Sequence, residues 1–408
     1  MISIDIAMEP SISTLAQLRA DIALTKQFTY FQTGSEGPVP DSTQRLMAIT
    51  IAEENTTGLR GRGAYAQLAN RAEQARESLA RLLHVTSDTL AWTQNTSLAI
   101  RLAVGSLPWR AGDRLALTSE EHISTRILKV AIEQITGRPA TIIPVAQGEA
   151  YSPADFLEAL DRLLTPDHRL FIISHVSCIN GARLPVAEAV QLAHQRGVKV
   201  LVDGAQAVGQ FPVDVSAIDP EFYAGSVHKW LLGPAGIGYL YVARRQLPEY
   251  HPNLMPSPFP SGWEYGGIRP ATAAGQTQIG TETLSLRMGA GRMTEIFQRI
   301  GLETIEAHSR ALTYRLRYGL KRIAGFEVLT PYPWEYSSGI TSLYFPGWPA
   351  ERVQALIDRI WDDYQIVVKR QMEFDGIRIS IASFNTEAEV DRLLEALAHL
   401  VPVMKAGI

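Results

Sequence analysis

Stretches with helical periodicity alternate with short apolar stretches along the first two thirds of the chain. Small apolar residues recur every three or four positions from Ala64 to Leu83, which predicts an amphipathic helix over residues 64–84. Short strands joined by helices are typical of a buried, mainly parallel sheet, so the pattern predicts an α/β domain. The other elements predicted here are strands over residues 114–118, 141–145, 170–174, 198–202, 222–226 and 237–242, and helices over residues 97–107, 124–135, 153–164 and 184–196.

The pattern changes after residues 252–274, an irregular segment rich in proline, glycine and aromatic residues. Long helices are predicted to reach residue 323, and the final helix begins with a capping-box pattern at Thr386 and Glu389. We predict an N-terminal segment over residues 1–35 that packs with the small domain, a large domain over 36–285 and a smaller α+β domain over 286–408. The elements predicted for the smaller domain include strands near 326–330, 339–345, 365–370 and 377–382 and a helix over 350–363.

Composition and charge narrow the kinds of partner that the chain can recognise. The 408 residues are 46% hydrophobic and 20% charged, as in ordinary folded proteins, and the net charge is −4 without a basic run. Nucleic acids and anionic membranes are therefore disfavoured as partners, and we expect a small ligand. The first fifteen residues do not resemble a secretory signal, and no apolar run is long enough to span a membrane. We expect a cytoplasmic protein.

Cys178 is the only cysteine of the chain. It excludes an internal disulfide and any multi-cysteine metal site within one chain, and we predict no bound metal. Its position just after a predicted central strand favours a small packed residue over a reactive thiol.

A lysine and an aspartate at the ends of two predicted strands are the strongest candidates for chemistry. Lys229 follows the strand that ends at Ser226, and a desolvated amine there can form an imine. Asp203 follows the strand over residues 198–202, where a carboxylate can keep a pyridinium nitrogen protonated. Taken singly, Lys229 could be a surface lysine and Asp203 a helix cap or an ion-pair partner. The 26 residues between them leave room for one crossover and one strand, which favours a shared site.

Two weaker signals lie at the same predicted edge of the sheet. The hydroxyl and amide side chains from Thr93 to Ser97 precede a predicted helix and suit a phosphate, although N-capping explains them about as well. His122 follows the strand that ends at Thr118, and only this position distinguishes it from a structural histidine. Each signal gains weight from its neighbours.

Together these motifs resemble the class V aminotransferase branch of the fold-type I enzymes that depend on pyridoxal 5′-phosphate. The resemblance runs from Thr29 to the final helix and rests on Asp203-Gly204-Ala205-Gln206 and on the run from Ser226 to Lys229. This branch contains cysteine desulfurases, selenocysteine lyases and the cyanobacterial cystine carbon–sulfur lyase. It implies a large domain with a mainly parallel seven-stranded sheet, a smaller α+β domain and a homodimer with shared active sites.

The resemblance gives each matching residue an expected role. Lys229 would bind the cofactor covalently and later move the proton of the substrate α carbon, and Asp203 would pair with the pyridine nitrogen. Arg378 would bind the substrate carboxylate, a task suited to a planar bidentate donor. The other expected cofactor contacts are His122 on the ring face, Gln206 near the ring hydroxyl, Thr96, Ser97, Ser226 and His228 at the phosphate, and Thr281 of the partner subunit; Asn180 and Arg370, or Lys369 beside it, are further candidates for binding substrate.

The stretch before Arg378 departs from the desulfurases of this family. Those enzymes carry a nucleophilic cysteine on a loop at this point, whereas residues 367–375 contain none. The chain resembles the cystine lyase more closely in this loop, around Asn95, and at His175 followed by Asn180-Gly181. The resemblance therefore implies β-elimination on L-cystine or L-cysteine-type substrates, giving pyruvate, ammonia and a persulfide or sulfide.

Other activities stay open at this point. The family also contains aminotransferases and epimerases of the isopenicillin N epimerase type, while a cysteine desulfurase is less favoured. A noncatalytic binding protein with this fold would leave the joint presence of Asp203, Lys229 and Arg378 unexplained. A nicotinamide-dependent dehydrogenase is disfavoured, because Gly61-Arg62-Gly63 lacks both a preceding strand and a third glycine.

Overall fold

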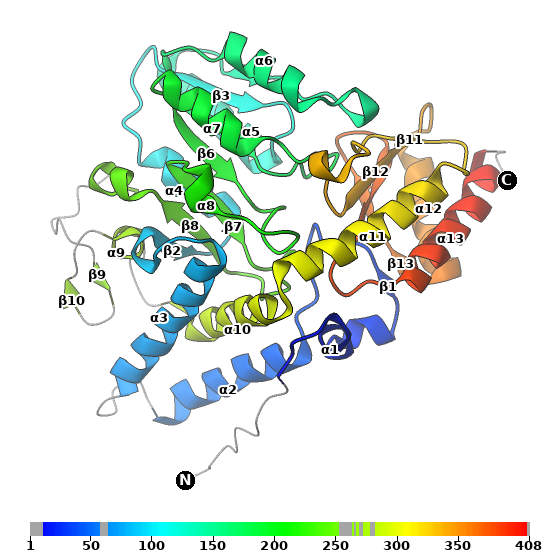
Figure 1. Cartoon of the computed structure of the whole chain (residues 1–408), viewed down its shortest axis with the longest axis horizontal. Coiled ribbons are helices and arrows are strands. Elements are labelled where there is room, and N and C mark those ends of the chain that lie inside the picture. The colour runs from blue at the N-terminus through cyan, green and yellow to red at the C-terminus, as the bar shows by residue number, and fades with distance from the viewer. Residues whose placement is uncertain are drawn as a thin grey trace.

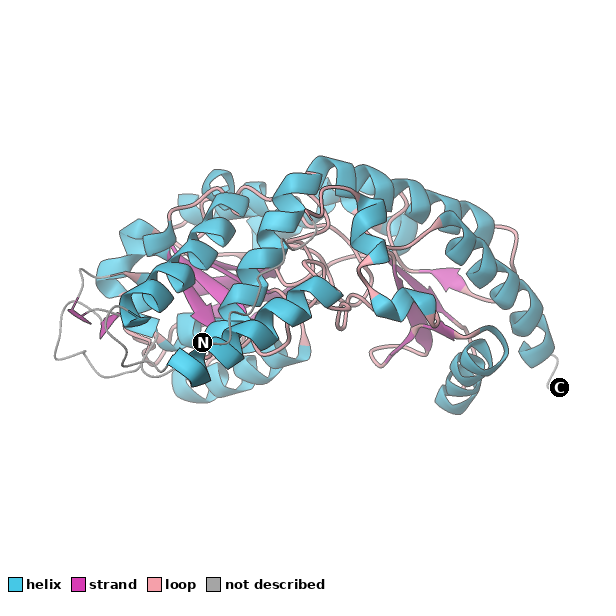
Figure 2. Ribbon diagram, turned by 90° about the horizontal axis from the view of Figure 1, so that it is seen from below, coloured by secondary structure: helices cyan, strands magenta, loops and turns pink. Residues whose placement is uncertain are grey.

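The chain folds into two lobes, each built around its own sheet (Figures 1 and 2). The computed structural model describes residues 11–57, 64–252, 263–264, 267–268, 272–277 and 282–405. Thr281, the turn at residues 60–63 and most of the irregular segment after residue 252 lie outside the described residues. None of the helices in the described part is long and apolar enough to cross a membrane.

The first lobe is centred on a seven-stranded sheet with the order β2-β8-β7-β6-β5-β3-β4. Strand β8 runs antiparallel to both of its neighbours, and the other strands share one direction. This confirms the mainly parallel seven-stranded sheet. The strands are β2 (Leu90–Thr93), β3 (Arg114–Thr118), β4 (Thr141–Ile143), β5 (His168–Ser174), β6 (Lys199–Asp203), β7 (Phe222–Ser226) and β8 (Gly238–Val242).

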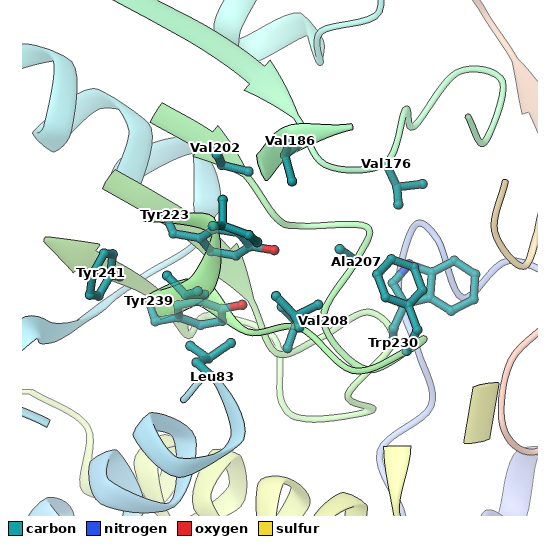
Figure 3. Packing of buried hydrophobic residues seen from close by; sticks show 14 of the residues in the cluster. Leu83, Val176, Val186, Val202, Ala207, Val208, Tyr223, Trp230, Tyr239 and Tyr241 are labelled. Atoms are coloured by element: carbon teal, nitrogen blue, oxygen red, sulfur yellow. The ribbon is translucent and has the colours of Figure 1, made fainter. Parts of the chain in front are cut away.

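Both faces of this sheet are buried. Successive strand residues point to opposite sides, and each side is covered by its own apolar core. Phe171 and Ile173 join one apolar core, whereas Leu170 and Ile172 join the core on the other face. Figure 3 shows part of the first core, where aromatic side chains of β7 and β8 pack. The covering helices of this lobe are α4 (Thr96–Gly105), α5 (Ile123–Thr136), α6 (Pro153–Leu163), α7 (Val186–Gln195), α8 (Val215–Ile218) and α9 (Ala273–Thr277). Two short strands, β9 (Trp263–Glu264) and β10 (Gly267–Ile268), pair antiparallel with each other.

A helical layer below the sheet connects the two lobes (Figure 1). Helix α10 (Leu284–Ile300) packs against α2 (Asp41–Thr57) and α3 (Ala64–Leu82), and most of its buried apolar residues belong to the core of the first lobe. Helix α11 (Leu302–Leu320) continues to the second lobe, where it packs against α13 (Glu387–Lys405). The predicted boundary between the two domains, at residue 286, falls near the start of α10, which packs against the first lobe. The boundary itself stays a prediction.

The second lobe is the expected smaller α+β unit. Its antiparallel sheet has the order β11-β12-β15-β14, and α12 (Ala350–Tyr364) and α13 pack against each other. The capping box of α13 is formed, since Glu389 N donates to Thr386 Oγ1 and Thr386 N donates to Glu389 Oε2. The strands are β11 (Glu327–Val328), β12 (Ile340–Tyr344), β14 (Lys369–Gln371) and β15 (Gly376–Ser380), with β13 (Ile366–Val367) beside them.

The N-terminal segment contacts both lobes. Strand β1 (Thr29–Tyr30) pairs with β13, and Phe31 is buried in the core of the second lobe. Leu18 of α1 (Leu15–Ala20) instead joins the core of the first lobe. The sequence pattern did not predict α2 or the four-residue strand β2, and the extent of the N-terminal segment as a unit stays a prediction.

Candidate active site

The carboxyl ends of the parallel strands bring the predicted chemical groups to one edge of the first sheet. Ser174 at the end of β5 is in register with Asp203 at the end of β6. Asp203 in turn is in register with Ala224 of β7, two residues before Ser226. Because the strands are parallel, the residues that follow them collect above the same edge, as the sequence predicted.

The antiparallel strand β8 brings the Thr93–Ser97 stretch to that edge as well. Gly238 at the start of β8 pairs with Ser226 on one side and with Thr93 on the other. A Cβ at Gly238 would lie 2.9 Å from Asn95 Cα, so only glycine allows this close approach. The predicted helix start is confirmed, because the Asn95 side chain caps α4 by accepting from Leu98 N at 2.9 Å. The Thr93–Ser97 stretch therefore both caps α4 and lies close to Ser226.

A cavity of about 1170 Å³ lies above this edge, between the two lobes. It is lined from both lobes and from the N-terminal segment. Nine of the predicted site residues line it: Thr96, Ser97, His122, Asp203, Gln206, Ser226, His228, Lys229 and Arg378.

Asp203 and Lys229 form the electrostatic centre of the cavity. Asp203 is buried, its Oδ1 accepts from Ala205 N at 2.9 Å, and burial raises its pKa. Burial lowers the pKa of Lys229, while the attraction of Asp203 opposes that shift. A lysine with a lowered pKa supplies the free amine that imine formation and proton transfer require.

His122 lies at the wall of the cavity as the N-cap of α5. Its Nδ1 accepts from Ser124 N at 3.2 Å, which assigns the ring proton of a neutral imidazole to Nε2. Burial and the nearby Lys229 lower the pKa of His122. A neutral ring is therefore favoured at this position, as suits a stacking role.

Arg378 enters the cavity from β15 of the second lobe. It is 2% exposed, so it is not an arginine on a solvent-facing strand. Its Nη1 donates to the backbone oxygen of Cys178 at 2.7 Å, and its Nη2 donates to Ser35 Oγ at 2.8 Å. The guanidinium is thus fixed by one contact to the first lobe and one to the N-terminal segment.

Gln206 is held by two neighbours. Its Nε2 donates to Gly34 O at 2.9 Å, and its Oε1 accepts from Trp230 Nε1 at 2.8 Å. A Cβ at Gly34 would lie 2.9 Å from Ser380 Oγ. Glycine at this position therefore lets the N-terminal segment pass close to both Gln206 and the second lobe.

Two predicted substrate contacts do not reach the cavity. Asn180 is fully buried, and its Oδ1 accepts from Ala182 N at 2.9 Å, which closes the turn around Gly181. Arg370 lies in β14 between Lys369 and Gln371, and only these two flanking residues line the cavity. Alternate residues of a strand face opposite sides, so the structure places Lys369 and not Arg370 on the cavity wall, and a substrate contact by either residue stays a prediction.

Sequence reasoning missed several polar residues of the site. Glu121 is buried and accepts from Ser174 N at 2.8 Å, from Ser174 Oγ at 2.8 Å and from Thr118 Oγ1 at 2.6 Å. Burial, together with the nearby Asp203, raises the pKa of Glu121 to about 7. Glu373 lines the cavity from the connection between β14 and β15. Its position two residues after the polar stretch 369–371 was the available signal.

Unpartnered buried atoms show that the cavity suits a phosphate ester. Thr96 Oγ1, Ser226 Oγ and His228 Nδ1 are buried without a hydrogen-bond partner among the described residues. Hydroxyl and ring N–H groups are donors that a phosphate can accept from. A buried carboxylate and an amine with lowered pKa lie in the same cavity. The residues present therefore fit pyridoxal 5′-phosphate, the predicted cofactor.

Solved structures share this architecture over nearly the whole chain. A C-DES variant with glycine covalently linked to its pyridoxal phosphate cofactor has a TM-score of 0.82 at 25% identity, covering 93% of this chain and 99% of that one. The cystine C–S lyase C-DES in complex with its product cysteine persulfide has a TM-score of 0.80 at 26% identity, covering 91% and 97%. The predicted fold class is confirmed, and the cofactor in the first of these structures agrees with the predicted one.

Sequence relatives point to the same family. Isopenicillin N epimerase of Streptomyces clavuligerus is 30% identical over 406 residues, which span 96% of this chain and 99% of that protein. A cysteine desulfurase of Escherichia coli is 31% identical over 363 residues, covering 82% and 84%. The family model described as aminotransferase class-V matches residues 39–393. The chain therefore belongs to the class V aminotransferase family.

Proposed function

We propose that the protein is a carbon–sulfur lyase that eliminates the sulfur substituent of L-cystine and related cysteine-type substrates. The products would be pyruvate, ammonia and a persulfide or sulfide. The observation that carries the proposal is the cavity itself, which joins Lys229, Asp203 and Arg378 while its β14–β15 wall carries no thiol. The likeness to the cystine lyase C-DES supports the same reaction.

The cofactor is pyridoxal 5′-phosphate. When bound, it supplies an electron sink for the negative charge that develops at the substrate α carbon. Asp203 would hold its ring nitrogen and His122 would cover its ring. The phosphate would be held by Thr96, Ser97, Ser226 and His228, the first, third and fourth of which bring buried unpartnered polar atoms.

Two side chains of the cavity would have separate roles in the elimination. Arg378 would bind the substrate carboxylate, and its two protein contacts fix the guanidinium for that task. Lys229 would accept the α proton on Nζ, since burial favours its neutral amine. The electron pair of the carbon–sulfur bond would leave with the sulfur, and water would then release pyruvate and ammonia. A persulfide is a weaker base than a thiolate and leaves more readily, which favours a disulfide substrate.

The desulfurase route needs a nucleophilic thiol. Cys178 lines the cavity, but it follows β5 in a buried turn instead of lying on the β14–β15 connection. Burial raises the pKa of its thiol, with the nearby Arg378 opposing, so the thiolate is disfavoured. Elimination without an enzyme thiol accounts for these features.

Product analysis tests the proposal. Protein loaded with pyridoxal phosphate is supplied with L-cystine, and pyruvate, ammonia and released sulfur are quantified. We expect equal amounts of pyruvate and ammonia, and no product from Lys229→Ala. Cofactor binding without pyruvate from L-cystine or L-cysteine would refute the lyase assignment.

Amino-acid epimerisation is the second candidate, favoured by the near full-length match to isopenicillin N epimerase. Both reactions begin with removal of the α proton, which Lys229 could perform in either case. Deuterium entering recovered substrate from D₂O, with inversion and without pyruvate, would favour the epimerase. Transamination would instead leave the aminated form of the cofactor.

The proposal extends to the assembly of the protein and its location. We propose a homodimer in which Thr281 of the partner subunit completes the phosphate site, and a cytoplasmic location. Sedimentation of the loaded protein tests the dimer, and a monomer with full activity would refute the shared site.

A further inference from the structure

A buried glutamate behind the cavity has no role in the proposed elimination. Glu121 is fully buried and is not among the residues that line the cavity, whereas the next residue, His122, does line it. The Glu121 carboxyl accepts from three donors, which are Thr118 Oγ1, Ser174 N and Ser174 Oγ. Burying an ionisable group is costly unless its partners hold it, so this side chain is fixed in one place.

The Glu121 side chain joins two strands at the point where their backbones separate. Backbone pairing of β3 with β5 stops before the last residue of each strand. Thr118 ends β3 and Ser174 ends β5, so the contacts of Glu121 connect these two ends. Ser174 is in turn the register partner of Asp203. The carboxyl group therefore fixes the strand end next to Asp203, and the backbone of Glu121 leads directly into His122.

Glu121 and Asp203 also interact through their charges. The Asp203 carboxylate adds to the effect of burial in raising the pKa of Glu121. An electrostatic interaction is mutual, so an ionised Glu121 adds negative potential at Asp203. His122 and Lys229 act on Asp203 with the opposite sign, whereas the groups of β3 and β5 that contact Glu121 are uncharged hydroxyls and a backbone amide. A cation bound at Asp203 would therefore be stabilised by both carboxylates.

We propose that Glu121 is a positioning residue for the cofactor ring, which acts through Asp203 and supplies a second negative charge near it. The Glu121 carboxyl fixes the end of β5 next to Asp203, and its ionised form favours binding of a protonated ring nitrogen. The bound cofactor and the ionised Glu121 therefore stabilise each other. This inference depends on the cofactor and not on whether the substrate undergoes elimination or epimerisation.

Cofactor affinity at two pH values tests the proposal. Glu121→Gln keeps the shape of the side chain but cannot ionise, and equilibrium dialysis gives the Kd of pyridoxal 5′-phosphate for both proteins at pH 5.5 and pH 8. With a pKa of about 7, the wild-type Glu121 is mostly neutral at the lower pH and mostly ionised at the higher one. We expect the ratio of the variant Kd to the wild-type Kd to rise about fivefold or more from pH 5.5 to pH 8. A contribution to packing alone would give the same ratio at both pH values, and that result would overturn the proposal.

Glu120→Gln is the matched control, because it changes the neighbouring glutamate. Glu120 is also buried, it accepts from Ser177 Oγ at 2.9 Å, and burial raises its pKa. The charges that act most strongly on it are those of Arg126 and Glu373. The ratio of its Kd to the wild-type Kd should change by less than about twofold between pH 5.5 and pH 8. A rise equal to that of Glu121→Gln would show that any buried glutamate of this turn has the same effect, which contradicts the proposal.

Thr118→Val tests the same coupling while leaving the carboxyl group in place. The substitution removes the hydroxyl that donates to Glu121 Oε1, and losing a donor to the ionised form raises the pKa of Glu121 further. Less of the variant than of the wild type would then be ionised at pH 7, whereas ionisation is nearly complete in both at pH 9. We expect the Kd of pyridoxal 5′-phosphate to be about twofold or more above wild type at pH 7 and equal to it at pH 9. The same increase at both pH values would assign the loss to packing and refute the electrostatic role.

Discussion

Asp203 and Lys229 control each other's protonation at the residue scale. Burial pushes both groups toward their neutral forms, while their mutual attraction favours the charged pair. A bound pyridinium would give Asp203 a second positive partner. The Asp203 carboxylate would thus interact electrostatically both with the cofactor ring and with Lys229, the base that moves the α proton.

Replacing the carboxylate tests this coupling. Asp203→Asn keeps the side-chain shape but cannot hold a protonated ring nitrogen, so we expect kcat to fall by about a hundredfold or more. Steady-state pyruvate formation at saturating cofactor measures the loss. A kcat within twofold of wild type would show that the carboxylate is not needed.

The buried Glu121 carboxyl makes the free energy of unfolding depend on pH. Its pKa is raised from 4.5 to about 7 in the folded protein, mainly by burial. Between these values the unfolded carboxyl ionises while the folded one stays protonated, so Glu121 lowers stability as pH rises. This contribution is absent near pH 4 and complete above pH 7.

Glu121→Gln should remove that dependence, because its amide does not titrate. We expect the wild-type free energy of unfolding to fall relative to the variant between pH 5 and pH 8, as measured by urea denaturation at both values. The same wild-type-minus-variant difference at both values would contradict the raised pKa.

Sequence reasoning found the site residues that follow predicted strands. Asp203, Lys229 and His122 each lie within four residues after a predicted strand, so their placement at one edge follows from parallel strand order. The choice of Lys369 over Arg370, and the place of Glu373, could not be predicted in the same way. Their direction depends on the register of a short β14 strand, which a three-residue run does not specify.

At the scale of elements, two glycines make room for tyrosines below the site. A Cβ at Gly204 would overlap the ring of Tyr223, and one at Gly225 would overlap the ring of Tyr239. Figure 3 shows these rings side by side with their hydroxyls on the same side. Tyr223 also bonds His175 Nδ1 at 3.0 Å, which ties β7 to the end of β5.

Adding a methyl group should disturb this packing. We expect Gly204→Ala to lower the free energy of unfolding by about 1–3 kcal/mol, because the Tyr223 ring must move. Urea denaturation of the loaded protein measures the change. Ala205→Gly, next in the chain, serves as a control without overpacking; a loss below 0.5 kcal/mol for Gly204→Ala would show that the ring has room.

Strand and helix prediction succeeded where the pattern was strongly periodic. Residues 114–118 and 222–226 form β3 and β7 with the predicted bounds. The missed elements include α2, which carries several threonines and an asparagine, and β2, which has only four residues. Such weak or short patterns are stabilised by tertiary packing, which local sequence does not reveal.

At the scale of the whole molecule, the cavity depends on the contact between the lobes. Arg378 reaches Cys178 O, Ser342 Oγ donates to Ile179 O at 2.6 Å, and Gly339 N donates to Gln210 Oε1 at 2.8 Å. These bonds join residues more than a hundred positions apart. Sequence periodicity cannot predict such pairs, whereas resemblance to the family placed Arg378 in the site.

Family membership determines the fold and cofactor more firmly than the reaction. Relatives of similar identity include an epimerase and a desulfurase, so function must be argued from the cavity. The feature that separates the proposed lyase from a desulfurase is the role of the one thiol, Cys178.

The most direct measurement compares pyruvate and alanine formed from L-cystine, and separately from L-cysteine with a thiol reductant, by wild-type and Cys178→Ala proteins, both loaded with pyridoxal phosphate. The proposed elimination uses no enzyme thiol, so both proteins should release pyruvate and ammonia at similar rates and form no alanine. Alanine from the wild-type protein, with all turnover lost in Cys178→Ala, would contradict the lyase assignment and establish a thiol-dependent desulfurase.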